Sequence, residues 1–178
     1  MILRRLTPVD AAALFSYRSL PKVFRYQSFR PETIADADAF LAGTAAEANV
    51  PETWYQLGIF LKDTPALIGD IGIHFLPDGE IELGCTLAPE SQGQGFATEA
   101  VSAVIGYLFE VMDKRRIVFS IDPRNSQSRN LAARMGMRQI GLFEKSVLIG
   151  SEWCDDAVYA IGAEDWAGRR PRIDPGRD

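Results

Sequence analysis

A short turn that contains two glycines constrains the fold of this chain more than any other feature. A β-type segment ends at Leu87, Pro89 stops it, and a strong helix pattern begins at Thr98. Between them, Gly93 and Gly95 allow backbone N–H groups to turn inward without obstruction by a Cβ atom. Such N–H groups, together with the N-terminus of a helix, bind anions, so the turn predicts a site for a diphosphate.

The turn differs from the two common nucleotide-binding patterns. It is too short for a P-loop, and no Lys-Ser/Thr pair follows it. It also lacks the third glycine of the dinucleotide fingerprint, and the strands before it are joined by short turns, which do not build a parallel sheet. A Rossmann-type protein is therefore disfavoured. From these residues alone, a plain turn between strand and helix is the alternative to an anion site.

Hydrophobic periodicity predicts an α+β chain. Alternating or β-branched segments predict strands at 2–6, 54–62, 67–73, 80–87, 116–121, 137–149 and 155–161. Apolar positions three and four residues apart predict helices from Thr7 to about Arg18, from Thr33 onward, at 98–112 and at 126–135. Short turns at 63–65 and 77–79 join three strands into an antiparallel meander, and 150–152 joins the last two.

Composition excludes several classes of function. The 178 residues, 47% hydrophobic and 24% charged, suit one globular domain, which we place at 1–166 with a disordered tail at 167–178. The net charge of −5 argues against a broad nucleic-acid-binding surface. Two cysteines and one histidine are too few for a structural zinc site, so no metal is expected. Because neither a signal peptide nor an apolar stretch of about 20 residues is visible, we expect a cytoplasmic protein without a membrane span.

The glycine turn also carries a resemblance to a known family. The spacing Gln92-x-x-Gly95-x-Ala97 matches the Q/R-x-x-G-x-G/A loop of the GCN5-related N-acetyltransferases, the GNAT superfamily. The longer runs 84–89 and 92–100 resemble the RimJ/RimL branch, which acetylates the N-termini of ribosomal proteins. Further matches to that branch are Asn125-x-x-Ser128, Gly136-Met137, Gly150-x-x-Trp153-x-Asp155 and Glu164-Asp165-Trp166. The resemblance covers nearly the whole chain.

The resemblance implies a GNAT fold: a mixed, mostly antiparallel central sheet that is flanked by helices and splayed at the cofactor site. Acetyl-CoA would lie in the split, which follows the strand ending near Leu87, with its pyrophosphate on the amides of Gly93 to Ala97. Its pantetheine would pair with the backbone of 85–87 like an additional strand. A backbone amide near Leu87 would polarise the thioester carbonyl. The cofactor-binding residues expected on this basis are Cys85, Thr86, Leu87, Gln92, Gly93, Gln94, Gly95, Phe96, Ala97, Thr98, Asn125 and Ser128.

The group that protonates the leaving thiolate is the first open question in the catalytic machinery. Many family members use a tyrosine seven residues after the asparagine, and that position is Ala132 in this chain. Resemblance to the ribosomal branch offers Ser128 instead, one helical turn after Asn125. The alternatives are that Asn125 is a plain N-cap and that Ser128 is an ordinary residue of the first turn.

The general base is the second open question. Glu82 is the leading candidate, because it lies on the strand that leads into the glycine turn and burial in a cleft can raise the pKa of a carboxylate. A solvated or ion-paired glutamate is the alternative, Asp155 and Glu144 are weaker candidates, and catalysis can also proceed without a dedicated base. His74 is interpreted as a packed or surface residue. Cys85 is interpreted as packing, because this superfamily transfers the acetyl group directly, without an acyl-enzyme.

We therefore expect an N-acetyltransferase that moves the acetyl group from acetyl-CoA directly to a primary amine, with a protein N-terminus as one acceptor. The alternatives are a small amine, such as an aminoglycoside, a polyamine or an amino acid, and a non-catalytic module that binds acyl-CoA. Phe24, Tyr26 and Phe29 either line the acceptor cleft or pack on the core. The final strand pair leaves a homodimer open as an assembly.

Overall fold

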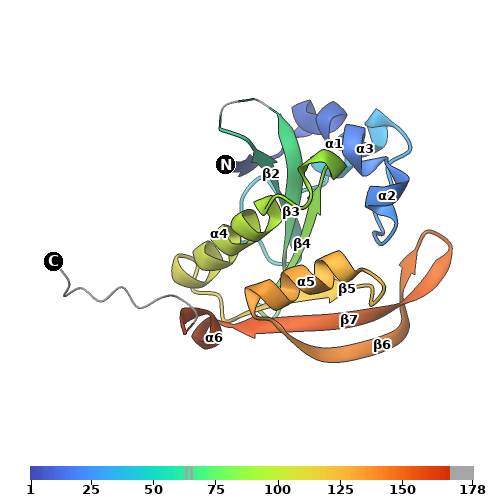
Figure 1. Ribbon diagram of the computed structural model, residues 1–178. Coiled ribbons are helices and arrows are strands. Elements are labelled where there is room, and N and C mark those ends of the chain that lie inside the picture. The colour runs from blue at the N-terminus through green and yellow to red at the C-terminus, as the bar shows by residue number, and fades with distance from the viewer. Residues whose placement is uncertain (63, 65, 169–178) are drawn as a thin grey trace.

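The strands of the protein form one mixed sheet in the order β1-β2-β3-β4-β5-β7-β6 (Figure 1). The computed structural model describes residues 1–62, 64 and 66–168. The strands are β1 (Ile2–Arg5), β2 (Thr53–Phe60), β3 (Leu67–Phe75), β4 (Ile81–Leu87), β5 (Arg116–Ile121), β6 (Arg138–Ile149) and β7 (Glu152–Gly162). The predicted α+β class with a mostly antiparallel mixed sheet is confirmed.

The sheet splits between its fourth and fifth strands. β4 and β5 are parallel, and their register holds only two pairs, Ile81 with Ile117 and Glu82 with Val118. Beyond these pairs β4 runs on to Leu87 while β5 turns away, although both keep their antiparallel partners, β3 and β7, on the other side. One edge of β4 is therefore open at its C-terminal end, immediately before the glycine turn.

Helices cover both faces of the sheet. They are α1 (Ala11–Arg18), α2 (Pro21–Phe24), α3 (Ile34–Ala42), α4 (Phe96–Glu110), α5 (Ser126–Met135) and α6 (Ala163–Ala167), with single 3₁₀ turns at Pro8–Asp10 and Pro89–Ser91. In α4, Val101, Val104, Ile105 and Leu108 repeat at helical spacing and are buried against the strands. α1 and α3 form a separate apolar cluster with Leu6 and Phe60.

The predicted element boundaries hold with small differences. α4 begins at Phe96, two residues earlier than predicted, because Gly95 takes a left-handed φ of 87° and lets the helix start at once. No helix is predicted between Arg18 and Thr33, yet this segment contains α2, which Pro21 starts and buried Val23 anchors. The predicted turn at 63–65 lies outside the described residues except for residue 64, and so does the predicted tail except for residues 167 and 168.

No helix in the described part of the chain is long and apolar enough to cross a membrane.

Candidate active site

The glycine turn forms an open cradle of backbone amides. Gly93 and Gly95 have φ values of 74° and 87°, and a Cβ atom added to either would meet nothing within 4 Å. Within the described part of the chain, the N–H groups of residues 93–98 have no hydrogen-bond acceptor. Gln92 Nε2 braces the turn by donating to the Leu87 carbonyl at 3.0 Å. The space and the free donors therefore fit a bound diphosphate.

The open edge of β4 presents further unpaired backbone groups. The Ala88 N–H donates to the Ile68 carbonyl, so the backbone of residue 88 faces the β3 side. Since alternate residues of a strand direct their N–H and C=O groups to opposite edges, the groups of Cys85 and Leu87 face the gap toward β5. The Leu87 carbonyl accepts from Gln92, so the groups left for a ligand are the N–H and C=O of Cys85 and the N–H of Leu87. This arrangement fits the predicted pairing of an extended ligand with 85–87.

A cavity of about 600 Å³ begins at this gap; we call it the first cavity. The predicted cofactor-binding residues that line it are Cys85, Thr86, Leu87, Gln92, Gly93, Ala97, Asn125 and Ser128. Gln94, Gly95, Phe96 and Thr98 belong to the same turn and the first turn of α4, but they do not line the cavity. Basic side chains also line it, and they are Lys22, Arg25, Arg124 and Arg134. Cationic walls around free amides suit a ligand with several phosphates.

The basic lining was only partly foreseeable from the sequence. The sequence predicts a basic edge near the cofactor, or else a solvated helix face, from Arg124, Arg129 and Arg134. Arg124 and Arg134 line the first cavity and Arg129 does not. Arg134 Nε donates to Thr98 Oγ1 at 3.1 Å beside the cradle. Lys22 and Arg25 were missed, because they belong to α2 and the residue after it, which the sequence pattern did not predict. Only the fold brings this segment opposite the glycine turn.

A second cavity of about 500 Å³ is lined by residues 82–86 of β4 and by residues 119–121 of β5. Aromatic side chains line it, namely Tyr26, Phe29, Phe40, Trp54 and Phe119, and so do the carboxylates Glu82, Asp122, Asp155 and Asp156. Of the predicted cleft aromatics, Phe24 is absent from this wall and instead lies under the Arg30 guanidinium, 4.4 Å from its ring centroid. The mixture of rings and carboxylates suits an amine with an apolar body.

The two cavities meet at a shared wall, which we call the junction. The residues that line both cavities are Tyr26, Gln27, Cys85, Thr86, Asn125, Ser128 and Leu131. A group held in the first cavity can therefore be reached from the second only at these residues. The structure brings Ser128 and Asn125 to this position together with the end of β4.

Ser128 and Asn125 combine a structural contact with a place at the junction. The Asn125 side chain accepts a hydrogen bond from the Ser128 N–H at 3.1 Å, so Asn125 is an N-cap of α5. The Ser128 hydroxyl is left for other partners. Ala132, which stands where many relatives have a tyrosine, is fully buried in the core.

Glu82 lines the second cavity and is paired with the only histidine. His74 Nδ1 lies 3.3 Å from Glu82 Oε2, and the imidazole stacks on Trp54 with 4.5 Å between ring centroids. The pairing follows from the register of β3 and β4, which places residues 74 and 82 opposite each other. Of the weaker base candidates, Asp155 lines the same cavity and accepts from the Lys145 N–H, whereas exposed Glu144 does not reach it.

The thiol at the junction is held in its neutral form. Burial raises the pKa of Cys85 to about 12, and the negative charge of Asp70 adds to the effect. A neutral thiol is a poor nucleophile. Cys85 is therefore poorly suited to attack an acyl group.

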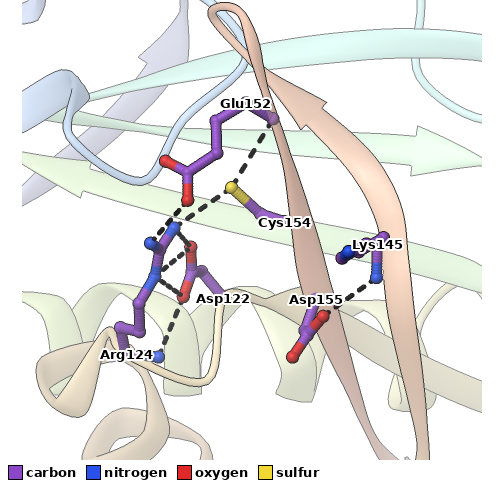
Figure 2. A network of polar contacts seen from close by, with 6 residues as sticks. All are labelled: Asp122, Arg124, Lys145, Glu152, Cys154 and Asp155. Atoms are coloured by element: carbon purple, nitrogen blue, oxygen red, sulfur yellow. Dashed lines mark hydrogen bonds and ion pairs between the residues drawn. The ribbon is translucent and has the colours of Figure 1, made fainter.

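A polar network ties the β6–β7 hairpin to the loop before α5 (Figure 2). Arg124 Nη2 donates to Asp122 Oδ2 at 2.7 Å, and its Nη1 donates to Glu152 Oε1 at 3.0 Å. Arg124 Nη2 also lies 3.1 Å from Cys154 Sγ. The hydrogen bonds from Arg124 hold the pKa of Asp122 below its usual range. The network joins the loop before α5 to β7, the strand that also carries Asp155 of the second cavity.

The described residues contain no group of three or more His, Cys, Asp and Glu side chains that could share a metal ion.

Comparison with known proteins places this arrangement in a family. Residues 1–138 match the family model described as Acetyltransferase (GNAT) domain. An uncharacterised N-acetyltransferase of Bacillus subtilis, YnaD, is 30% identical over 93% of this chain and 95% of its own length. The [ribosomal protein uS5]-alanine N-acetyltransferase of Escherichia coli is 29% identical over 65% of this chain and 61% of its own length. A GNAT-family acetyltransferase structure from Bacillus anthracis superposes with a TM-score of 0.80 at 28% identity, covering 91% of this chain and 94% of that chain.

Proposed function

Because the chain belongs to the GNAT acetyltransferase family, we propose that it moves the acetyl group of acetyl-CoA directly to a primary amine, and that protein N-terminal amines are among its acceptors. The observation that carries the proposal is the open cradle of amides at Gly93 and Gly95, next to an unpaired strand edge. The relatives with N-acetyltransferase names support the reaction. The relative that acetylates a ribosomal-protein alanine supports the acceptor class.

The residues that would hold acetyl-CoA follow from the first cavity. The amides of 93–97 would bind the pyrophosphate, and Lys22, Arg25 and Arg134 would add positive charge around the phosphates. The backbone of Cys85 and Leu87 would pair with the pantetheine arm. When bound, acetyl-CoA supplies an activated acetyl thioester at the junction.

The chain's own groups would then move two protons. Glu82, supported by His74, would accept a proton from the acceptor amine, directly or through a water, as that nitrogen bonds to the acetyl carbon. The Ser128 hydroxyl would protonate the sulfur as the carbon–sulfur bond breaks, and would take up a proton from solvent in the same step, so that it ends as a hydroxyl. The N–H groups at the open edge of β4 would stabilise the charge on the carbonyl oxygen.

A small polycationic amine is the second candidate acceptor, and one observation favours it. Glu82, Asp155 and Asp156 line the second cavity. Among the residues that the structure describes, Arg18 alone is a basic residue of its lining, and it is already bound to Asp70. A surplus of carboxylates would bind additional ammonium groups. The aromatic residues beside them instead suit the apolar side chains of a peptide.

The cradle is tested by substituting Gly95 with tryptophan. We expect Gly95→Trp to weaken acetyl-CoA binding at least about 100-fold in calorimetry, because a large side chain would fill the space for the phosphates and strain the left-handed backbone. Gly79→Trp is the matched control, since Gly79 also has a positive φ, 83°, and open space, but lies in the β3–β4 turn. Unchanged affinity in Gly95→Trp would contradict the site.

The acceptor is tested by a screen of amines. Free thiol release from acetyl-CoA would be measured with peptides that begin in alanine or serine, with polyamines, with aminoglycosides and with free amino acids. We expect peptides to give the highest kcat/KM. A higher kcat/KM for a polyamine would support the second candidate acceptor instead. If no amine causes release of free thiol from acetyl-CoA, a catalytic role is contradicted.

A further inference from the structure

A chain of hydrogen bonds, buried around Asp70 and partly buried around Gln27, leads from the core of the protein to the junction. Asp70 on β3 is fully buried and accepts from Arg18 Nη2 at 2.5 Å and from Arg18 Nε at 3.1 Å. Tyr17 and Gln56 also donate to Asp70, so its carboxylate is fully used. Burial alone would lower the pKa of Arg18, but the charge and hydrogen bonds of Asp70 outweigh burial and raise it.

Arg18 fixes the orientation of Gln27. Arg18 Nη1 donates to Gln27 Oε1, and a guanidinium can only donate. The amide oxygen of Gln27 must therefore face Arg18. This contact decides which end of the Gln27 amide is the oxygen and which is the nitrogen. The amide nitrogen of Gln27 then faces the strand, where Nε2 donates to Thr86 Oγ1 at 3.0 Å.

Gln27 in turn fixes the direction of the Thr86 hydroxyl. The oxygen of Thr86 accepts from Gln27, so its own proton points elsewhere. Thr86 is 6% exposed, and within the described part of the chain its hydroxyl proton has no acceptor. Thr86 lines both cavities at the junction, and the open-edge N–H groups of Cys85 and Leu87 flank it.

From this geometry we propose that Thr86 is a catalytic hydrogen-bond donor to the acetyl carbonyl oxygen, and that Gln27 and Arg18 are positioning residues that aim it. The inference rests on the proposed acetyl transfer. As the amine nitrogen bonds to the acetyl carbon, the carbonyl π pair moves to oxygen, and Thr86 stabilises that charge without losing its proton. When the carbonyl re-forms, the carbon–sulfur bond breaks, the thiolate is protonated, and the hydroxyl returns to its starting state.

Two substitutions at Thr86 test the donor. Thr86→Val keeps the shape and removes the hydroxyl, so we expect kcat to fall about 10- to 100-fold, while the acetyl-CoA dissociation constant changes less than about threefold. Thr86→Ser restores a donor and should keep kcat within about threefold of the wild type. Thr44→Val is the matched control, because Thr44 is also buried but donates to the Leu41 carbonyl, away from both cavities.

Substitution of Gln27 tests the orientation without touching Thr86. In Gln27→Glu, one carboxylate oxygen can still accept from Arg18, while the other would accept the Thr86 proton and turn it away from the junction. We expect kcat to fall as far as in Thr86→Val. The double variant should be no slower than Thr86→Val alone, because both changes remove the same hydrogen bond.

The outcomes separate this inference from the proposed function. Wild-type protein that binds acetyl-CoA and releases thiol with an amine, combined with full turnover in Thr86→Val, would overturn the role of Thr86 alone. An equal further loss from Gln27→Glu in the Thr86→Val background would show that the added charge acts independently, which would overturn the role of Gln27. A wild type that neither binds nor turns over acetyl-CoA would instead contradict the proposed function.

Discussion

At the scale of single residues, Ser128 illustrates how one position serves the fold and the site through different atoms. Its backbone N–H completes the cap of α5, while its side chain lies at the junction of the two cavities. The two contributions can be separated, because alanine keeps the N–H and removes only the hydroxyl. The proposed proton donor is therefore testable without disturbing the helix.

We expect Ser128→Ala to lower kcat about 10- to 100-fold while the acetyl-CoA dissociation constant changes less than about threefold, because general-acid assistance to the thiolate is lost. Steady-state kinetics and calorimetry measure the two effects. Ser126→Ala is the control, since Ser126 opens the same helix and lines the first cavity but not the second. Equal losses in turnover and binding at Ser128 would make it a binding residue only.

At the scale of elements, the sequence predicted most of the helices and strands because each depends on its own periodicity. The helix α4 and the strand β5 follow from apolar positions within the segment. The glycine turn was predictable for the same reason, because a local backbone requirement places glycine there. The helix α2 was not predictable, because its four residues are too few to show a hydrophobic periodicity and its stability comes from packing.

Long-range polar pairs account for what the sequence could not predict in the site. Arg18 and Asp70 are 52 residues apart, and Gln27 and Thr86 are 59 apart. Each residue type alone is compatible with solvent exposure, and only the register of the sheet and the docking of α1 bring them together. The pair of His74 and Glu82 likewise depends on the register of β3 and β4.

The tie between the β6–β7 hairpin and the loop before α5 is also an element-scale feature, and it predicts a pH dependence. The Asp122 side chain is 1% exposed and accepts several hydrogen bonds from Arg124, which is half exposed. We expect Asp122→Asn to lower the free energy of unfolding by about 2 kcal/mol at pH 7, because it removes the charge from these hydrogen bonds. Asp165→Asn is the control, since Asp165 pairs with Arg138 at 2.8 Å on the surface and should matter by less than about 0.5 kcal/mol.

The sign of the pH dependence follows from the lowered pKa of Asp122. The folded protein holds this carboxylate ionised at a lower pH than the unfolded chain does, so its contribution is complete above the ordinary value of 3.8 and is lost as the pH falls below it. Urea unfolding of the wild type and of Asp122→Asn should therefore differ equally at pH 7 and pH 5, and converge below pH 3.8. A difference that grows on acidification would contradict the assignment.

At the scale of the whole molecule, the split between β4 and β5 determines where the two cavities lie. The departure of β5 from β4 opens the edge of β4, and the residues at this edge line both cavities. The basic side chains gather around the first cavity, and the carboxylates gather around the second. The net charge of −5 does not indicate that basic and acidic side chains line different cavities, because this separation of charge depends on the fold.

Two chambers that touch only at one wall have a consequence for the order of events during turnover. Acetyl-CoA and the acceptor amine can be bound at the same time, because neither has to leave before the other binds. Initial rates measured at varied concentrations of acetyl-CoA and of the amine should therefore give intersecting double-reciprocal lines. Product inhibition by CoA should be competitive with acetyl-CoA and not with the amine. Parallel lines would mean that acetyl-CoA transfers its acetyl group to the protein before the amine binds, and they would contradict this prediction.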